Sequence, residues 1–450
     1  MNVTIGKDIR IRNYSPELLG WCEQNLVLDN PDYHRAVNAG RWVGNIEKNF
    51  ILYEKRGDTL VLPFGVLKKV WSFIKNMPVD LQFSPIQHFS AKGHINLYDY
   101  QENALNELIR SKNGILEAPC GSGKTQIGLA LIGELKQKAL WLTHTKDLLM
   151  QSMSRAQQYY DGDFGTITDG KVEIGQDITF ATVQTMTKLN LADYADEFNV
   201  IIVDECHKVA GTPTRLMQFY KVVTSLNARH KYGLSATLSR SDGLIKSTFA
   251  TLGDIVFTIP EQDIGDKIIQ AKHVLIETGI PDTEAYLEYD GTLKHNKLID
   301  YLITSSERNQ LIVDKIQQNP ARNVLLLSHR VSHLVTLSNM IENPKTFVVH
   351  GNVSKNERNT IYDTIRQTQG NVLLATYSLA KEGLDIPSLD MLILATPQKD
   401  KSTVVQSVGR IERNYENKPE PIVYDLVDEN ILYCYRASKT RKNILRKRKF

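Results

Sequence analysis

Nine short apolar runs constrain the fold of this chain most strongly. KALWLT, DITFAT, VIIVD and KYGLSAT form a first series, and NVLLLSH, TFVVHG, NVLLATY, MLILAT and PIVYDLV form a second. Stretches with helical spacing, such as YQENALNELIRS and RNQLIVDKIQQN, flank or separate them. Continuous apolar runs that alternate with amphipathic helices are typical of buried parallel strands. Two consecutive series therefore predict two α/β domains in tandem.

Residues 1–90 have a different pattern. KNFILYEKRGDTLVLPFG has two β-rich runs around a Gly-Asp turn, which predicts a hairpin, and GVLKKVWSFIKNM predicts a helix after it. We interpret this region as a small α+β domain. The α/β domains are then expected at residues 91–260 and 261–450, with Ile259–Tyr289 as the connection between them.

Composition and cysteine usage exclude several protein classes. Hydrophobic residues make up 42% of the chain and charged residues 23%, as in ordinary globular proteins. No apolar run is long enough for a membrane span, and MNVTIGKDIRIRNY lacks the apolar core of a signal peptide. The four cysteines (Cys22, Cys120, Cys206 and Cys434) match no zinc or disulfide spacing. We therefore expect no membrane partner and a reducing, cytoplasmic location.

The end of the chain is basic. The net charge is +3, but the last fifteen residues, RASKTRKNILRKRKF, hold eight Lys or Arg and no acid. The remainder therefore carries +3 − 8 = −5. Such a tail would suit phosphate binding, or it would be a solvated and frayed terminus.

The segment APCGSGKT, Ala118–Thr125, matches the phosphate-binding pattern G-x-x-x-x-G-K-[ST] except that alanine replaces the first glycine. GILEA before it suits a strand and TQIGLALIGEL after it suits a helix, which is the context that the pattern requires. Lys124 would reach the β- and γ-phosphates of a nucleotide and Thr125 would bind Mg²⁺. The residues expected to contact nucleotide here are Pro119, Cys120, Gly121, Ser122, Gly123, Lys124 and Thr125.

Two further segments predict hydrolysis of that nucleotide. VIIVDECH places Asp204 and Glu205 after an apolar strand, where Asp204 would hold Mg²⁺ and Glu205 would deprotonate the attacking water. QSVGRIER, in the second series, offers Arg410 and Arg413 as arginines that stabilise the transition state. Because Lys124 and these arginines belong to different domains, nucleotide would draw the two domains together.

Together with other segments, these motifs resemble those of superfamily 2 helicases over about Leu97–Tyr435. LYDYQ, APCGSGKT, THTKDLLMQ, ATVQTM, DECH, LSATL, LLLSHR, ATYSLAKEGLDIPSLD and QSVGRIER follow in the family's order. DECH, EGLDIP and the N-terminal segment around NPDYHRAVNAGRW are most similar to XPB-like and phage branch-migration helicases. The resemblance implies an α/β chain with two tandem RecA-like parallel-sheet domains behind a small α+β domain, and it implies ATP and Mg²⁺ as cofactors.

The resemblance also implies roles for individual residues. Gln101 would read adenine, and Tyr98, where the family usually has arginine, would stack on it. Gly383, Asp385 and Gln406 would contact nucleotide from the second domain. Ser235, Thr237 and His207 would couple the ATP site to the nucleic-acid site. The residues expected to line the nucleic-acid strand are Thr145, Thr182, Gln184, Arg330, His350 and Thr376. Each of these hydroxyls could instead be a capping or turn residue.

In the N-terminal domain, HRAVNAGRW brings Arg35, Arg41 and Trp42 close together in sequence. The arginines would hold phosphate, and the tryptophan would stack on an unpaired base at a junction. The alternative is that Trp42 is a core residue and that the domain only supports its neighbour.

Other clusters are interpreted as structural. His329 and His333 lack an accompanying carboxylate pattern, and Cys206 is expected to pack in the core. DGDFGTITDG lacks the calcium-loop pattern and is interpreted as a turn.

The sequence therefore predicts an ATP-dependent DNA helicase or translocase that acts as a monomer on forked or branched DNA in recombination, repair or replication. A 3′-to-5′ polarity is implied by the resemblance alone. The alternatives are an RNA helicase, a duplex-DNA translocase that does not separate strands, and an ATP-gated clamp without turnover.

Overall fold

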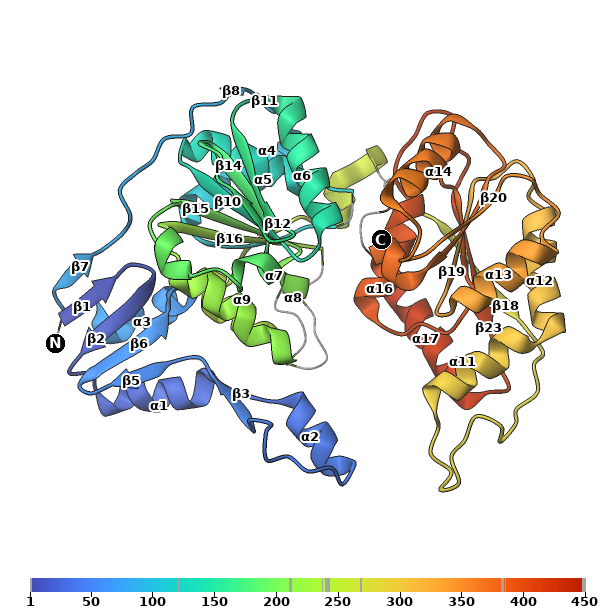
Figure 1. Cartoon of the computed structure of the whole chain (residues 1–450), viewed down its shortest axis with the longest axis horizontal. Helices are drawn as coiled ribbons and strands as arrows, with labels where there is room; N and C mark the ends of the chain where they lie inside the picture. Colours follow the sequence, from blue (N-terminus) through green and yellow to red (C-terminus); the bar gives the residue numbers. More distant parts are fainter. Residues whose placement is uncertain are drawn as a thin grey trace. The chain divides into compact units, whose positions relative to one another are not determined.

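The computed structural model describes residues 2–119, 121–209, 213–236, 238, 243–267, 269–381, 384 and 386–446 (Figure 1). The chain divides into two compact units, Met1–Asp263 and Ile264–Phe450. No helix within the described ranges is long and apolar enough to cross a membrane.

The N-terminal part of the first unit is built on a five-stranded sheet with the order β5-β6-β2-β1-β7. Its strands are β1 (Asn2–Ile5), β2 (Asp8–Arg12), β5 (Glu54–Arg56), β6 (Thr59–Pro63) and β7 (Val79–Leu81). The hairpin predicted around the Gly-Asp turn is confirmed, because β5 and β6 pair antiparallel on either side of Gly57, whose φ is 61°. The helices here are α1 (Pro16–Asn25), η1 (Phe64–Val66) and α3 (Leu67–Ile74). A separate two-stranded pair, β3 (Val27–Asp29) and β4 (Asn49–Ile51), encloses α2 (Pro31–Asn38).

The first RecA-like sheet has eight strands in the order β13-β12-β14-β10-β15-β16-β9-β17. Their bounds are β9 (Gly114–Glu117), β10 (Ala139–Thr143), β12 (Phe164–Thr168), β13 (Lys171–Glu173), β14 (Ile178–Thr182), β15 (Val200–Asp204), β16 (His230–Ser235) and β17 (Ile255–Thr258). All of these strand pairs are parallel except β12 with β13. DGDFGTITDG is therefore not a simple turn, because β12 runs through it and only Asp169 and Gly170 turn the chain, with φ of 52° and 77°.

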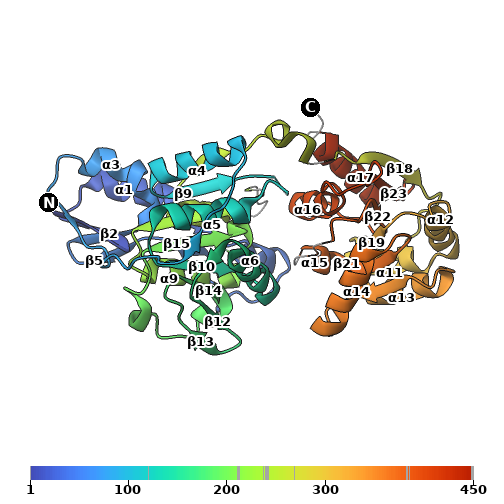
Figure 2. The ribbon, with the colours of Figure 1, turned by 90° about the horizontal axis from the view of Figure 1, so that it is seen from above.

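Helices cover both faces of this sheet. They are α4 (Asp99–Ser111), α5 (Lys124–Leu135), α6 (Lys146–Tyr159), α7 (Val183–Met186), η2 (Leu191–Tyr194), α8 (Cys206–Val209), α9 (Pro213–Ser225) and α10 (Ile245–Leu252). A small pair, β8 (Lys92–Gly93) with β11 (Tyr160–Asp161), lies beside them. α4 and α5 lie next to each other (Figure 2), and α5 packs on the sheet where a Cβ on Gly128 would be 2.8 Å from Leu234 and Trp141. On the other face, Leu142 and Val203 share a core with Val222 of α9 and Leu252 of α10.

That same core extends into the N-terminal sheet. Phe64 and Val70 belong to it, and a Cβ on Gly65 would be 2.5 Å from the backbone nitrogen of Gly253. Lys231 of β16 is 0% exposed, and its Nζ donates to the carbonyls of Lys7 at 3.1 Å and Val223 at 3.0 Å. The N-terminal region and the first RecA-like sheet are therefore packed as one body.

The second unit contains a fully parallel six-stranded sheet with the order β18-β23-β22-β19-β21-β20. Its strands are β18 (Lys272–Glu277), β19 (Val324–Ser328), β20 (Thr346–Val349), β21 (Val372–Thr376), β22 (Met391–Leu394) and β23 (Ile422–Val427). The boundary between the units in the sequence falls within η3 (Glu261–Lys267). The helices of the second unit are α11 (His295–Thr304), α12 (Ser306–Gln317), α13 (Val331–Met340), α14 (Lys355–Gln367), α15 (Tyr377–Lys381), α16 (Lys401–Ile411) and α17 (Leu432–Arg446). The two tandem α/β domains predicted from the apolar runs, and the RecA-like parallel sheets implied by the resemblance, are thus confirmed. The expectation that Ile259–Tyr289 is only a connection is wrong, since β18 is an edge strand of this sheet. Half of its side chains are exposed, so it lacks the continuous apolar run of a central strand.

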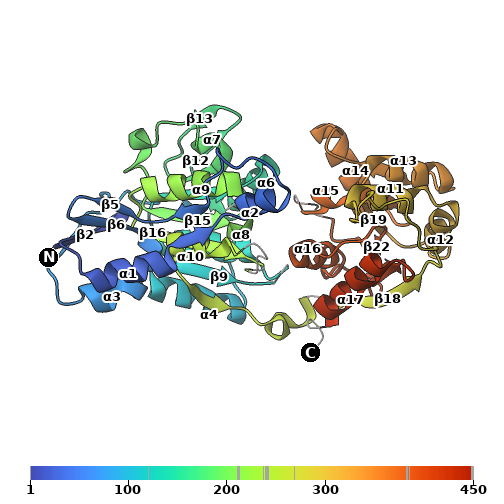
Figure 3. The same cartoon turned by 90° about the horizontal axis from the view of Figure 1, so that it is seen from below.

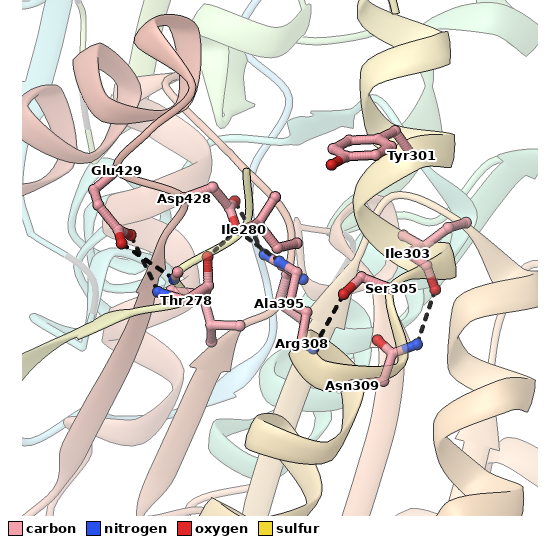
Figure 4. Close-up of polar contacts among 12 residues, drawn as sticks. Thr278, Ile280, Tyr301, Ile303, Ser305, Arg308, Asn309, Ala395, Asp428 and Glu429 are labelled. Carbon is pink, nitrogen blue, oxygen red and sulfur yellow. Dashed lines mark hydrogen bonds and ion pairs between the residues drawn. The ribbon is translucent and has the colours of Figure 1, made fainter. Parts of the chain in front are cut away.

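Two buried arginines bracket the loop that precedes α16. Arg308 donates from Nε to Asp428 at 2.7 Å and from Nη1 to the carbonyl of Ala395 at 2.6 Å (Figure 4). Arg441 donates from Nε to Asp425 at 2.8 Å and from Nη1 to the carbonyl of Gln398 at 3.0 Å. Both arginines and both carboxylates are almost fully buried. Residues 395–398 are therefore held at each end by an arginine whose charge is balanced by a buried aspartate, Arg308 at Ala395 and Arg441 at Gln398.

Candidate ATPase and strand-binding site

The segment APCGSGKT connects β9 to α5. Gly121 and Gly123 have φ of 84° and 81°, a left-handed backbone that favours glycine. A Cβ on Gly123 would be 2.2 Å from Nε2 of Gln101, and this nitrogen donates to the carbonyl of Ser122 at 2.8 Å. Glycine is thus needed at position 123 both for the backbone and for the close approach of Gln101. The loop opens a twelve-residue helix, whose N-terminus attracts anions.

Lys124 lies against its own loop. Its Nζ donates to the carbonyls of Ala118 at 3.1 Å and Pro119 at 3.4 Å. The backbone nitrogen of Ala118 in turn donates to the carbonyl of Ser235 at 2.8 Å. An ammonium, left-handed glycines and a helix start in one loop fit the phosphates of a nucleotide.

The carboxylates of DECH lie at the end of β15, next to β16. Asp204 is buried and accepts from the backbone nitrogen of Glu205 at 2.9 Å. Glu205 has a φ of 48°, and its carboxylate is 3.4 Å from Nδ1 of His207. The same Nδ1 is 2.6 Å from Oγ of Ser235. A chain of contacts therefore runs from the phosphate-binding loop through Ser235 and His207 to Glu205.

Cys206 packs in the core between these groups. Burial raises the pKa of its thiol well above the ordinary value, and the neighbouring carboxylates of Glu205 and Asp204 act in the same direction. A Cβ on Gly233 would be 2.9 Å from its Sγ. The thiol is therefore protonated and tightly packed, which rules against a nucleophilic role.

Tyr98 and Gln101 begin α4 beside the phosphate-binding loop. The backbone nitrogen of Tyr98 donates to Oε1 of Gln101 at 3.0 Å, so both ends of this amide bind backbone groups of the protein. The ring of Tyr98 is half exposed and stacks on Tyr100 with the ring centroids 5.9 Å apart. Sequence reasoning missed Glu117, whose Oε1 accepts from the backbone nitrogen of Leu238 at 3.3 Å. The sequence pattern that could have identified Glu117 is an acidic residue at the end of an apolar strand, directly before the phosphate-binding loop.

Three residues expected to bind the strand lie where β10 and β14 end side by side. Thr145 caps α6 by accepting from the nitrogen of Leu148 at 3.3 Å. Gln184 donates to the carbonyl of His144 at 2.9 Å. Thr182 is almost fully buried and donates to Thr185. The structure places all three at the carboxyl ends of neighbouring strands in the sheet. Thr145 is a helix-capping residue, as the alternative interpretation expected.

The corresponding residues of the second unit also follow strand ends. Arg330, after β19, donates to Asp300 at 2.9 Å and to Asn296 at 3.1 Å. Nδ1 of His350, after β20, accepts from the nitrogen of Asn352. Oγ1 of Thr376 is 3.0 Å from Oγ of Ser378. His333 is structural as expected. It is buried against Ser328 and Asn309, and burial lowers its pKa to about 3.

α16 carries the arginines of QSVGRIER. Arg410 donates from Nε to the carbonyl of Ala380 at 3.0 Å and from Nη1 to that of Leu384 at 2.8 Å. Gln406 is buried, and Arg413 follows the end of the helix with its side chain partly exposed. Arg410 therefore binds the backbone at both Ala380 and Leu384. Four residues assigned from the sequence lie outside the described residues, namely Cys120, Thr237, Gly383 and Asp385.

The residues assigned in the N-terminal region lie on α2 and the loop after it. Trp42 is 77% exposed, so the alternative that it is a core residue is wrong. Arg35 is exposed and forms an ion pair with Asp32 at 2.5 Å, and Arg41 is exposed as well. The structure therefore presents an indole and two guanidinium groups on the surface of one segment.

Two RecA-like sheets, a phosphate-binding loop and adjacent carboxylates define a motor that hydrolyses a nucleoside triphosphate. The family described as Type III restriction enzyme, res subunit, matches residues 94–240. The helicase conserved C-terminal domain matches residues 307–415. The chain is thus an ATP-hydrolysing enzyme and belongs to the superfamily 2 helicases, among which it resembles XPB and phage helicases.

Three relatives illustrate the resemblance. A protein of Acanthamoeba polyphaga mimivirus, provisionally named an ATP-dependent RNA helicase, is 28% identical, and the match covers 92% of this chain and 79% of that protein. The DNA 3′-5′ translocase XPB2 of Sulfurisphaera tokodaii is 27% identical, with 78% of this chain and 85% of the relative covered. The ATP-dependent DNA helicase uvsW of Enterobacteria phage T4 is 24% identical, with 90% and 85% covered.

Proposed function

We propose that this chain is an ATP-dependent DNA helicase or translocase that acts on forked or branched DNA, with 3′-to-5′ polarity. The observation that carries the proposal is the run of contacts from Ala118 through Ser235 and His207 to Glu205. Such a path would link nucleotide chemistry at Glu205 to Ser235 at the end of β16. DNA as the substrate is supported by the names of both the XPB2 and the uvsW relatives, and the 3′-to-5′ polarity by the name of XPB2.

In the proposed reaction, the loop nitrogens and Lys124 hold the triphosphate, and the lysine exchanges its loop carbonyls for phosphate oxygens. Glu205 accepts a proton from the attacking water. Thr125 and Asp204 would hold Mg²⁺, which supplies positive charge to the phosphates. Tyr98 stacks on adenine and Gln101 reads it, while Gln101 also holds the loop through the carbonyl of Ser122.

The second unit is proposed to complete the site. Arg410 and Arg413, with Gln406, stabilise charge on the phosphates in the transition state. Gly383 and Asp385 would contact nucleotide from the same unit. One strand would pass over the strand-end residues of both sheets, whose small polar groups suit contacts to phosphate.

Nucleic-acid-stimulated ATP hydrolysis tests the proposal directly. Hydrolysis is measured with single-stranded DNA, forked DNA and single-stranded RNA, and strand displacement is followed on forked DNA. We expect the largest stimulation by DNA, and we expect Glu205→Gln to bind ATP normally while turnover falls at least ~10²-fold, because only the base is lost. Lys124→Ala should lose binding as well. Equal turnover in Glu205→Gln and parent would show that the base is misassigned.

We further propose that the segment of Arg35, Arg41 and Trp42 selects the DNA structure, with Trp42 stacking on an unpaired base. Deleting residues 1–90 would not test this, since Phe64 and Val70 belong to the core of the first RecA-like sheet. The point variant Trp42→Ala leaves that core intact.

Trp71→Ala is the matched control, because Trp71 is 46% exposed in the same region but lies on α3. We expect Trp42→Ala to keep ATP hydrolysis on single-stranded DNA and to unwind forks at least fivefold more slowly, because base stacking contributes ~1–3 kcal/mol. The same rates in Trp42→Ala and Trp71→Ala would remove the selective role.

An RNA helicase is the second candidate, favoured by the provisional name of the mimivirus relative. It would be supported by stronger stimulation with RNA than with DNA in the same assay. A duplex translocase would hydrolyse ATP on duplex DNA without displacing a strand.

A further inference from the structure

The last described helix, α17, is fixed to the second unit by one face. Cys434, Ala437, Ser438, Arg441 and Leu445 are buried on that face, beside α16 and β23 (Figures 2 and 3). The ion pair of Arg441 with the fully buried Asp425 anchors the helix. The basic end of the chain is therefore a packed element as far as Arg446, and the interpretation as a frayed terminus is wrong over this range.

The opposite face of α17 is a stripe of four exposed cations, Arg436, Lys439, Lys442 and Arg446. At 3.6 residues per turn they fall within an arc of about 120°. None of the four has an ion-pair partner in the described part of the chain, and α17 contains no acid. We call these four residues the basic stripe.

The basic stripe is costly for the helix by itself. Its members are three or four positions apart, where like charges destabilise a helix by ~0.2–0.5 kcal/mol per pair. Cations in the last turn are compensated by the helix dipole, but this applies to Arg446 alone and leaves Arg436, Lys439 and Lys442 unexplained. The chain before the last fifteen residues has a net charge of −5, so the stripe is a local feature rather than part of a uniformly basic surface.

We propose that the basic stripe binds the sugar–phosphate backbone of duplex nucleic acid, at a site separate from the strand held by the RecA-like sheets. From Arg436 to Arg446 the helix rises ~15 Å, which matches about four phosphates of one strand. Nζ of Lys439 lies 4.3 Å from the ring centroid of Tyr435, so this cation covers a face of the ring on which a base could otherwise stack. Single-strand sites use open aromatic faces to stack bases, whereas duplex phosphates need only cations.

The proposal deepens the proposed function, since it assigns a second nucleic-acid contact to the same motor, but its test requires no hydrolysis. Binding of a fluorescent 20-base-pair DNA is measured by anisotropy over a range of salt concentrations without nucleotide. A single strand of the same length is measured in parallel. The test variant carries Arg436→Gln, Lys439→Gln, Lys442→Gln and Arg446→Gln.

A matched control loses the same charge elsewhere, through Lys92→Gln, Lys112→Gln, Lys136→Gln and Lys345→Gln. These lysines are exposed, and the last three precede β9, β10 and β20, at the opposite edges from the strand-end residues. For the duplex, we expect the slope of log K against log[salt] to become shallower by about 3.6 in the test variant, at ~0.9 for each of the four lost phosphate contacts. The control should change it by less than about 1.

Equal slopes in test variant and control overturn the proposal. An equal loss of slope on duplex and single strand also overturns it, because the stripe would then belong to the translocated strand. If the test variant does not fold, as judged by circular dichroism, the double variant Arg436→Gln and Lys439→Gln should show about half of the change, and no change in it overturns the proposal. ATP hydrolysis without nucleic acid should be the same in all variants. If DNA does not stimulate ATP hydrolysis by the parent protein, the proposed function is refuted, whereas the basic stripe is tested by the binding measurements alone.

Discussion

Lys231 allows the union of the N-terminal sheet with the first RecA-like sheet to be tested by pH. Burial lowers the pKa of its ammonium from 10.5 to about 7; Asp8 partly opposes this and Lys7 adds to it. In the unfolded chain the group keeps its ordinary pKa of 10.5. Between these two values the unfolded chain binds more protons than the folded chain, so the free energy of unfolding rises with pH. From pH 7 to pH 9 the rise amounts to about 2 kcal/mol.

The variant Lys231→Met removes this titration while keeping a side chain of similar length. We expect the free energy of unfolding of the parent to gain about 2 kcal/mol over the variant between pH 7 and pH 9, whatever their difference at pH 7. Urea unfolding followed by tryptophan fluorescence measures this unit alone, because Trp21, Trp42, Trp71 and Trp141 all precede Asp263.

The exposed Lys68 of α3 provides the control, and Lys68→Met should follow the parent at every pH. A parent and a Lys231→Met variant with the same pH dependence would refute the reasoning. Lys231 would then remain charged through Asp8 and its two carbonyl partners.

Two further predictions concern the motor. Ser235→Ala removes the hydroxyl next to His207, so ATP hydrolysis without nucleic acid should stay within about threefold while fork unwinding falls at least about fivefold, since one hydrogen bond contributes ~1 kcal/mol. Loss of both activities together would contradict a coupling role. Arg410→Ala should lower kcat for ATP by ~10³ and leave the KM for ATP within about tenfold, because the interaction strengthens in the transition state. A kcat close to that of the parent, measured at saturating DNA, would show that Arg410 only holds the carbonyls of Ala380 and Leu384.

Most strands of both RecA-like sheets could be predicted because buried parallel strands consist of continuous runs of apolar residues. Each of the nine runs contains one strand of the structure. The edge strand β18 escaped prediction because half of its side chains face solvent, and β12 escaped because glycine and threonine interrupt its apolar residues. The phosphate-binding loop and DECH could be placed from the sequence because their neighbours fix the ends of β9 and β15.

Contacts between residues far apart in the sequence could not be predicted from local patterns in this way. Arg308 and Asp428 are 120 positions apart and both fully buried, whereas charged residues in a sequence favour the surface. The apolar residues of η1 and α3 indicate a buried face, but not that η1 packs on α10 of the neighbouring α/β sheet. Trp42 was ambiguous because a large apolar side chain favours burial. Only the fold shows that the short segment around it leaves the indole exposed.

The shared core of the first unit also imposes an order on its synthesis. Lys7 accepts from Lys231, 224 positions later, and Gly65 packs against Gly253. At ~5–20 residues per second, the ribosome needs about ten to forty seconds to pass from Phe64 to the helix that covers it. Throughout that interval the N-terminal sheet exposes an apolar face, which makes the nascent chain a substrate for holding chaperones. Translation that stops before α10 would leave an aggregation-prone fragment rather than a folded domain.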